Sequence, residues 1–282
     1  MLLSFYPLIT GDVNLSLSNA KLFSQEAVRF IKQAKAVVLP RYCRACQYWF
    51  CKNHAPVFPN LDTQFRFKGK FGHTFVFSLC EVPHPPTKVY TGIEDFKKRH
   101  FEDHEPLFPY PLIVKWNKGG GGAFVYKVYN REGLFGALNT FRRYEHRGPT
   151  FIIQPYIKHG GKDLRVVVIG ERLLTYWRVQ TNPQEFRTNL GRGGKIEYNL
   201  APALEEKAIK LVKKICDYTG INLAAFDVLF PEQRPEPLFL EINYQFGLNG
   251  IGGHAAYNQL LREEVKKWWE TISKNYANSF TD

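Results

Sequence analysis

The sequence predicts a mixed α/β protein, and three observations support this. Residues 1–40 alternate two short apolar runs with one stretch of helical periodicity, which is a β-α-β pattern. Residues 204–220 repeat apolar side chains at helical spacing and end in a glycine, as an amphipathic helix does. Residues 222–230 and 237–245 are apolar stretches around a polar turn that contains prolines, which predicts paired strands.

The N-terminal part is predicted to alternate strands and helices. A strand at 1–9 and a second at 36–40 flank a helix at 21–34, where Phe23, Ala27, Phe30 and Ile31 recur at helical spacing. Further helices are expected at 41–55, 70–81 and 94–105, and prolines end the first two. The proline-rich stretch 86–110 is interpreted as the hinge into a second domain.

The remainder is predicted to be rich in strands. We expect strands at 111–116, 123–130, 150–157 and, as hairpins, 163–180, and helices at 131–143 and 260–272. A run of glycines at 119–122 lies between the first two of these strands. There is no internal repeat and no low-complexity segment.

Composition limits the class of protein. The 282 residues carry a formal net charge of +12, with 44% hydrophobic and 23% charged residues, so the chain is expected to be globular. No apolar run approaches the roughly 20 residues of a membrane span. The first 14 residues lack a basic segment and a cleavage site, so we expect a buried strand there, not a signal peptide, and a cytoplasmic protein. The charge leaves open an anionic substrate such as ATP, nucleic acid, or a solvated basic surface.

Three of the five cysteines and one histidine lie close together in the sequence. Cys43, Cys46, Cys51 and His54 have the number of ligands that a structural zinc site needs. If residues 42–54 are helical, however, Cys43 and His54 lie about 16 Å apart along the axis, and one ion cannot bridge them. We therefore expect these residues to share one broad, buried helix face, and bound zinc is the alternative.

A predicted hairpin carries the clearest candidate metal ligands. Asp227 and Glu241 lie symmetrically about Arg234, so an antiparallel hairpin centred there places the two carboxylates side by side. Asn243, two residues after Glu241, shares its face of the strand. Three oxygen ligands in an apolar setting suit Mg²⁺, which completes its shell with water and phosphate. The alternative is an ordinary hairpin with polar residues on its outer face.

A glycine loop follows a predicted strand that ends in a lysine. Lys115 lies at the end of that strand, and Gly119, Gly120, Gly121 and Gly122 come shortly after it. Glycines let backbone N–H groups approach a phosphate closely, and a lysine adds a fixed positive charge. The spacing fits neither a P-loop nor a dinucleotide-binding fingerprint. A mobile surface hairpin is the alternative.

Two more segments fit a nucleotide. The strand at 151–157 runs into Pro155, where Tyr156 and Ile157 can wall an adenine ring. In FRTNLGRGG, at 186–194, Arg187 and Asn189 point the same way from an extended chain and suit a polyphosphate or a developing anionic charge.

In their order along the chain, these segments resemble the ATP-grasp superfamily, and most closely its RimK-type branch of peptide ligases. The matching stretches are VK with a glycine loop, QPYI, GKDLRVVVIG, FRTNLGRGG, AAFDVLF, and LEIN followed by GLNGI, and they cover roughly residues 60–270. The resemblance implies an ATP-grasp fold with three parts. These are a small α/β N-terminal domain at 1–87, a central lid at 88–158 and a C-terminal part at 159–282 that carries the magnesium site.

The resemblance also assigns roles to residues. It implies that Lys115, Arg187 and Asn189 act in catalysis, and that Asp227, Glu241 and Asn243 bind the metal. The residues implied to contact the nucleotide are Lys70, Lys115, Gly119, Gly120, Gly121, Gly122, Gln154, Pro155, Tyr156, Ile157, Asp163, Arg187, Thr188 and Asn189.

The sequence departs from the family pattern at two places. Pro155 stands where the hinge usually has an acidic residue, and Phe246 replaces a proline near the expected acceptor pocket. Arg178 falls near a basic pair of the family, although loop length leaves its register open. His254 is expected at the surface or at a helix cap, with the acceptor pocket as the alternative.

By resemblance, the chain is an ATP-dependent ligase that uses ATP and two Mg²⁺ ions, with Mn²⁺ as a substitute. A carboxylate would attack the γ-phosphate to give an acylphosphate and ADP, and an amine, or less often a thiol, would then displace phosphate. The donor and acceptor are unknown and include small molecules and peptide or protein tails, and related enzymes are often homo-oligomers.

Two other functions remain open from the sequence. The first is a nucleotide-binding module that has lost catalysis. The second is a nucleic-acid-associated protein, because the basic and aromatic segment at 64–77 can stack bases. We expect instead that Phe65, Phe67, Phe71 and Phe75 pack in a core around Lys70.

Overall fold

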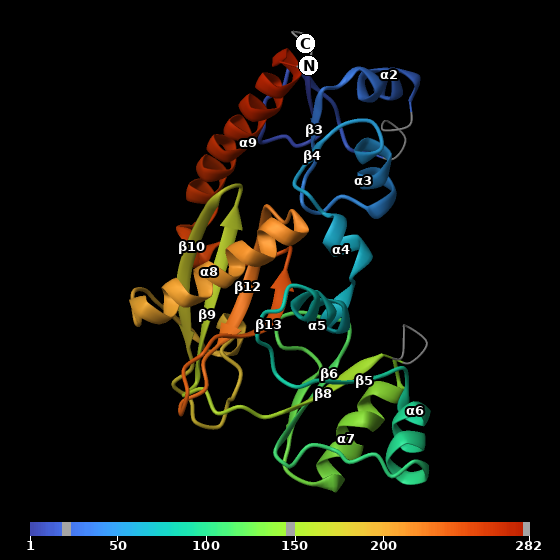
Figure 1. The fold of residues 1–282 in the computed structure, drawn as a ribbon, viewed down its shortest axis with the longest axis vertical. Coiled ribbons are helices and arrows are strands. Elements are labelled where there is room, and N and C mark those ends of the chain that lie inside the picture. The colour runs from blue at the N-terminus through green and yellow to red at the C-terminus, as the bar shows by residue number, and fades with distance from the viewer. Residues whose placement is uncertain (19–23, 145–149, 279–282) are drawn as a thin grey trace.

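The chain folds around three β-sheets. The structure is a computed structural model, and it describes residues 1–18, 24–144 and 150–278. Figure 1 shows the N-terminal elements and the last helix at one end of the molecule and the central sheet at the other. No helix in the described ranges is long and apolar enough to cross a membrane.

The N-terminal sheet is parallel and has the order β2-β1-β3-β4. Its strands are β1 (Leu2–Ser4), β2 (Val13–Asn14), β3 (Ala36–Val38) and β4 (Val57–Phe58). Its helices are α2 (Gln25–Gln33), α3 (Ala45–Lys52), α4 (Asp62–Arg66) and α5 (Gly69–Leu79). The β-α-β pattern expected at the N-terminus is therefore confirmed.

Helix α2 begins later than the sequence pattern indicates. The Ser24 hydroxyl accepts a hydrogen bond from the Ala27 amide, at 3.2 Å, and so caps the first turn. Residues 21–23 of the expected helix, Phe23 among them, lie outside the described residues.

The central sheet is antiparallel and has the order β5-β8-β6-β7. Its strands are β5 (Lys88–Tyr90), β6 (Leu112–Trp116), β7 (Val125–Val128) and β8 (Phe151–Pro155). Two α-helices and a π-helical turn pack on it, namely α6 (Ile93–Lys97), η1 (Lys98–Glu102) and α7 (Arg131–Arg142). The charged helix expected at 94–105 thus changes to π-helical hydrogen bonding at Lys98 and ends at Glu102.

The third sheet is antiparallel and has the order β11-β10-β9-β12-β13. Its strands are β9 (Lys162–Ile169), β10 (Arg172–Val179), β11 (Lys195–Glu197), β12 (Leu223–Leu229) and β13 (Leu238–Asn243). Its helical elements are η3 (Leu190–Arg192), α8 (Pro202–Thr219), η4 (Asn249–Ile251) and α9 (Gly253–Asn278). Gly220 ends α8 in the left-handed conformation, as the sequence predicts.

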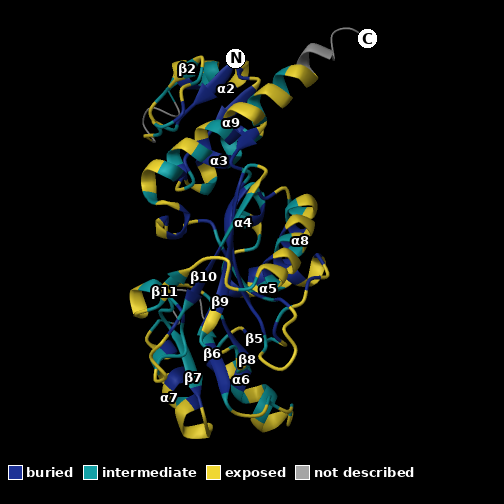
Figure 2. Ribbon diagram, turned by 90° about the vertical axis from the view of Figure 1, so that its left-hand side faces the viewer, coloured by how far each residue is buried: buried dark blue, intermediate teal, exposed yellow. Residues whose placement is uncertain are grey.

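Strand alternation gives the third sheet two different faces. One face carries Leu164, Val166 and Val168 and packs on the apolar side of α8, which includes Val212 and Ile215. Figure 2 shows β9 of this sheet buried and the outer face of α8 exposed, and the edge strand β11 is largely exposed. The opposite face is divided along its length between an apolar part and a polar part.

The apolar part of this second face joins the sheet to the N-terminal sheet and α9. Val167 and Ile169 of β9 share a core with Val38 of β3 and Leu261 of α9. The loop before α9 lies directly on this face, because a Cβ atom at Gly250 would come within 2.4 Å of the Tyr176 ring. Only a glycine permits so close an approach.

The cysteine segment differs from its predicted conformation. Helix α3 covers only Ala45–Lys52, and Cys43 lies before it. Cys43 and Cys51 are buried in the core, whereas Cys46 and His54 are exposed, so the expectation of one shared buried face is wrong for these two residues. Among the described residues, no group of three or more histidine, cysteine or acidic side chains is placed to hold a metal.

Candidate functional site

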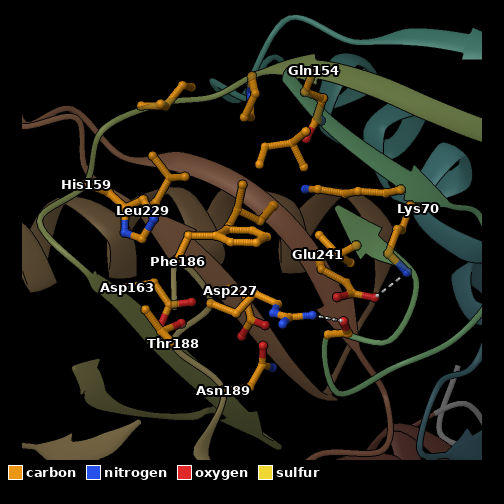
Figure 3. A pocket seen from close by; sticks show the side chains of 18 of the residues that line it. Lys70, Gln154, His159, Asp163, Phe186, Thr188, Asn189, Asp227, Leu229 and Glu241 are labelled. Atoms are coloured by element: carbon orange, nitrogen blue, oxygen red, sulfur yellow. Dashed lines mark hydrogen bonds and ion pairs between the residues drawn. The ribbon is translucent and has the colours of Figure 1, made fainter. Parts of the chain in front are cut away.

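A cleft lies between the central sheet and the polar part of the third sheet. Most of the residues selected from the sequence line it: Lys70, Lys115, Gly119, Gly120, Gly122, Gln154, Pro155, Tyr156, Ile157, Asp163, Arg187, Thr188, Asn189, Asp227 and Glu241. Figure 3 shows Gln154 on the opposite side of the cleft from Asp163, Thr188 and Asn189. Gly121 and Asn243 do not line the cleft. Gly121 lies between two glycines that do, and Asn243 forms a hydrogen bond with Asp227, which also does.

Strand register brings the charged residues into one row. Asp227 on β12 lies opposite Glu241 on β13, as the predicted hairpin requires, and a β-bulge follows Asp227. On its other side, Asp227 lies opposite Arg165 on β9. Asp163, two residues before Arg165, lies opposite Arg178 on β10. Because residues two apart share a face, these side chains all point to the cleft side of the sheet.

Two arginines hold the Asp227 carboxylate. Arg165 donates Nε–H to Oδ1 at 2.7 Å and Nη2–H to Oδ2 at 2.9 Å. The Arg178 guanidinium lies 3.1 Å from Oδ2. Burial alone would raise the pKa of Asp227, but the charges of Arg165 and Arg178 outweigh it and hold the pKa at about 2. Asp227 is therefore ionised at neutral pH.

Asp163 is the second carboxylate of this row. It pairs with Arg178, whose Nε–H donates to Oδ1 at 2.8 Å and whose Nη2 also contacts Oδ2. Both residues are buried at the edge of the cleft. The sequence analysis left the register of Arg178 open and did not select Arg165. The strand alternation from Asp163 to Arg165 is the signal that identifies the latter.

Three side-chain oxygens retain lone pairs for a metal. Asn243 Nδ2 donates to Asp227 Oδ2 at 3.1 Å, which leaves the Asn243 Oδ1 atom free to bind a cation. Asp227 Oδ1 accepts one hydrogen bond from Arg165 and keeps a second lone pair. The half-buried Glu241 carboxylate has an ion pair with Lys70 at 3.7 Å. This donor set, two carboxylates and an amide, fits Mg²⁺.

Two lysines bring positive charge to the same end of the cleft. Lys70, in the first turn of α5, is buried and donates to the Gly119 carbonyl at 3.0 Å, so it fixes the glycine loop. Figure 3 shows its ammonium group next to the Glu241 carboxylate. Burial lowers the pKa of Lys115 to about 8; Glu241 opposes this shift and Lys70 adds to it. Both lysines lie where an anion would balance their charge.

His73 anchors α5 to the metal-bearing hairpin, and the sequence analysis did not select it. Its Nδ1 atom accepts the Ile242 amide N–H at 3.3 Å, so the ring is neutral with the proton on Nε2. Burial, together with the charge of Lys70, lowers the pKa of His73 to about 3. The core expected around Lys70 is only partly present. Phe65 and Phe67 pack against the buried core, but Phe71 and Phe75, on the outer face of α5, are exposed.

The segment 185–189 is tied to the glycine loop. Arg187 donates to the Gly122 carbonyl at 3.1 Å and makes two hydrogen bonds of 2.8 Å to Glu185. Gly122 has a φ of +74°, and a Cβ atom there would lie 2.8 Å from Asn189 Oδ1. A glycine is therefore required at this contact. Arg187 and Asn189 thus reach the loop from the segment that follows β10 of the third sheet.

Hydrogen bonds to neighbouring segments hold the hinge at the end of β8. The Tyr156 amide donates to the Pro111 carbonyl at 2.9 Å, and Gln154 Nε2 donates to Thr87 Oγ1 at 2.8 Å. The Lys127 ammonium lies 3.5 Å from the centre of the Tyr156 ring. Pro155 offers no N–H donor here, so the backbone groups left for a ligand are those of its neighbours.

Comparison with known proteins places this cleft in a family context. Residues 75–261, well over half of the chain, match the model of the RimK-like ATP-grasp domain. The probable alpha-L-glutamate ligase of Pectobacterium carotovorum is 33% identical over 142 residues, and that of Pseudomonas aeruginosa PAO1 is 32% identical over 143. Each alignment covers 50% of this chain and 44% of the relative, so the chain spans less than half the length of these curated relatives.

Solved structures share the fold. The ATP complex of D-alanine–D-alanine ligase from Bacillus anthracis aligns with a TM-score of 0.63 at 16% identity, over 93% of this chain and 87% of that chain. An ATP-grasp RimK domain protein from Sphaerobacter thermophilus aligns with a TM-score of 0.58 at 16% identity, over 94% and 99%. The expected ATP-grasp fold is confirmed.

The two acidic residues of the hairpin should differ in their effect on stability. Asp227→Asn leaves two buried guanidiniums without their shared counter-charge, so the free energy of unfolding should fall by about 3–5 kcal/mol. Glu241→Gln removes only a half-buried ion pair of 3.7 Å and should cost about 1 kcal/mol or less. Urea denaturation measures both values, and equal losses would contradict this description of the charged row.

Proposed function

The chain belongs to the RimK-like ATP-grasp family, and we propose that it is an ATP-dependent ligase that joins a carboxylate to an amine through an acylphosphate. One observation carries the proposal. Lys70, Lys115 and Arg187, which come from three separate parts of the sequence, line the same cleft as Asp227 and Glu241. Cations beside carboxylates that can hold a divalent ion are what a bound polyphosphate requires.

The reaction has two steps. An oxygen of the donor carboxylate attacks the γ-phosphorus of ATP, the bond from that phosphorus to the bridging oxygen breaks, and ADP leaves. The nitrogen of the acceptor then attacks the acyl carbon, the carbon–oxygen bond to phosphate breaks, and the amine loses a proton to solvent. Phosphoryl transfer of this kind depends on positioning and charge neutralisation, and no covalent protein nucleophile is needed.

Different residues of the cleft have different roles in this reaction. Lys70 and Lys115 neutralise phosphate charge on one side, and Lys70 also fixes the glycine loop that lines the cleft. Arg187 and Asn189 approach from the third sheet, where negative charge develops on the transferred group. Gln154, Pro155, Tyr156 and Ile157 flank the base, and Asp163 and Thr188 lie toward the sugar.

Asp227, Glu241 and Asn243 would hold Mg²⁺. The bound metal would neutralise phosphate charge and orient the γ-phosphate for in-line attack. In the protein itself, Arg165 and Arg178 keep Asp227 ionised and fix its orientation, so one carboxylate is positioned before any ligand binds. Glu241 is the more accessible of the two carboxylates.

The substrates follow only in outline. Because relatives are named alpha-L-glutamate ligases, glutamate is the first amine to test with this chain.

We also keep the domain boundaries near residues 87 and 158 as part of the proposal, since each of the three sheets falls within one segment. A nucleic-acid-binding function has less support, because Lys70 within segment 64–77 is buried in the cleft.

Nucleotide affinity should depend on the charge of Lys115. A polyphosphate binds the protonated amine, and a pKa of about 8 leaves only about one molecule in ten charged at pH 9. Affinity for Mg-ATP, measured by calorimetry, should therefore fall about tenfold between pH 7 and pH 9. Lys115→Arg should flatten this dependence, and Lys118→Arg, at an exposed position of the same loop, should leave it unchanged. A flat wild-type profile would show that Lys115 does not contact the phosphates.

Hydroxylamine should trap the acylphosphate. Protein, Mg-ATP and hydroxylamine with pooled carboxylic acids should release ADP and form a hydroxamate detectable by mass. Glu241→Gln should reduce both products at least about 100-fold. The control is Glu236→Gln on the turn of the same hairpin, where the carboxylate pairs only with exposed Lys207. ATP binding without any hydroxamate, over a broad pool of acids and peptides, would favour a non-catalytic nucleotide-binding module.

A further inference from the structure

Arg41, a cationic side chain outside the cleft, has no acidic partner among the described residues. Arg41 is half-buried, and within the described parts of the chain no carboxylate forms an ion pair with it. Its guanidinium carbon lies 4.9 Å from the centre of the Phe246 ring and 5.3 Å from that of Tyr257. Its Nη1 donates to the Phe246 carbonyl at 3.3 Å. The contacts hold the guanidinium in place and leave other N–H donors for a ligand.

The position of Arg41 in the N-terminal sheet is typical of a ligand-binding residue. Arg41 follows β3 by three residues, and Tyr6 follows the neighbouring parallel strand β1 by two. The carboxyl ends of parallel strands form the edge where open α/β sheets bind ligands. Both residues lie beside Tyr257, whose ring centre is 5.3 Å from the Arg41 guanidinium carbon. Burial raises the pKa of the Tyr6 phenol, and the contact with Tyr257 and the charge of Arg41 oppose this rise.

A second phenol lies in the same place. Tyr257 on α9 is buried, and its hydroxyl forms no hydrogen bond of normal geometry with the described residues. The phenol of Tyr6 is its polar neighbour. A buried hydroxyl without a good partner costs free energy, which a bound ligand can recover. Arg41, Tyr6 and Tyr257 together form a cationic group with two hydroxyls, and we refer to them as the Arg41 cluster.

The Arg41 cluster adjoins the candidate active site. Phe246 comes three residues after Asn243, so the two Cα atoms are at most about 11 Å apart. The loop that contains Phe246 continues to Gly250, which lies against the Tyr176 ring. Tyr176 in turn lies opposite Arg165 in the sheet. The cluster and the charged row are thus connected along one face of the third sheet.

We propose that the Arg41 cluster binds a carboxylate of the amine substrate that is not consumed in the reaction. The proposal rests on the ligase function proposed above. A single guanidinium matches the charge of a carboxylate monoanion, whereas a phosphate monoester carries up to two charges and is usually bound by several cations. Phe246, at a position where the family pattern has proline, stacks on Arg41 and fixes the plane of the guanidinium. Arg41 thereby selects amines that carry a carboxylate.

The test measures binding of the twenty amino acids to the full chain. Calorimetry with the magnesium complex of a non-hydrolysable ATP analogue present should find at least one that binds, and its α-carboxamide should bind at least about tenfold more weakly. Arg41→Gln should weaken the amino acid about tenfold and abolish this discrimination, and Arg41→Lys, which keeps the charge, should weaken it less. Affinity for the analogue should not change.

Arg262→Gln is the matched control. Arg262 is an exposed arginine of α9 that also donates to a backbone carbonyl of the N-terminal segment, that of Leu8 at 3.0 Å, but it lies outside the cluster. This variant should bind the amino acid like the wild type. It removes a comparable contact between the same two parts of the chain, so it separates a lost structural contact from a lost carboxylate site.

Several results would overturn the proposal. The first is that the chain binds the ATP analogue tightly but binds no amino acid. The second is that Arg41→Gln still prefers the amino acid to its α-carboxamide. The third is that the chain binds glycerol 3-phosphate more tightly than amino acids. The proposal also fails if both Arg41 variants lose amino-acid binding in proportion to a fall in their melting temperature. Arg41 would then be a structural residue. If the wild type does not bind the analogue at all, the ligase function fails first, and the carboxylate site fails with it.

Discussion

The buried pairing of Asp227 with Arg165 and Arg178 is the interaction on which the rest of the site depends. A carboxylate inside a sheet face would ordinarily be protonated, and two guanidiniums would ordinarily be expelled to water. Strand register places them side by side, so each makes the burial of the others possible. The pairing keeps Asp227 charged and orients Asn243 through its amide. A row of fixed charge thus exists before any ligand enters.

The cleft is completed by parts that come from the rest of the chain. Helix α5 is attached to the hairpin through His73 and to the glycine loop through Lys70. Arg187 connects the same loop to the third sheet. The Lys70 and Phe71 amides also donate to Asn117, which follows β6. Hydrogen bonds therefore connect the glycine loop and the central sheet to the hairpin that carries the charged row.

The sequence predicted the hairpin and its paired residues because their positions follow from register alone. Asp227 and Glu241 are equidistant from the turn, and alternation assigns Asn243 to the same face. The contacts it did not predict depend on tertiary packing. Arg165 stands between Leu164 and the apolar run 166–169 of its strand, and the pairing of Arg165 with Asp227 depends on the neighbouring strand β12. No periodicity shows that Phe71 and Phe75 stay exposed. The environment of Arg41 joins residues more than 200 positions apart, which no local pattern encodes.

A crystal structure with Mn²⁺ and ADP, examined by anomalous scattering, tests the central claim most directly. The account predicts nucleotide in the cleft between the two sheets and an anomalous peak about 2.2 Å from oxygens of Asp227, Glu241 and Asn243, with Asp227 still held by Arg165. Nucleotide bound elsewhere, or nucleotide in the cleft with manganese remote from these side chains, would contradict it.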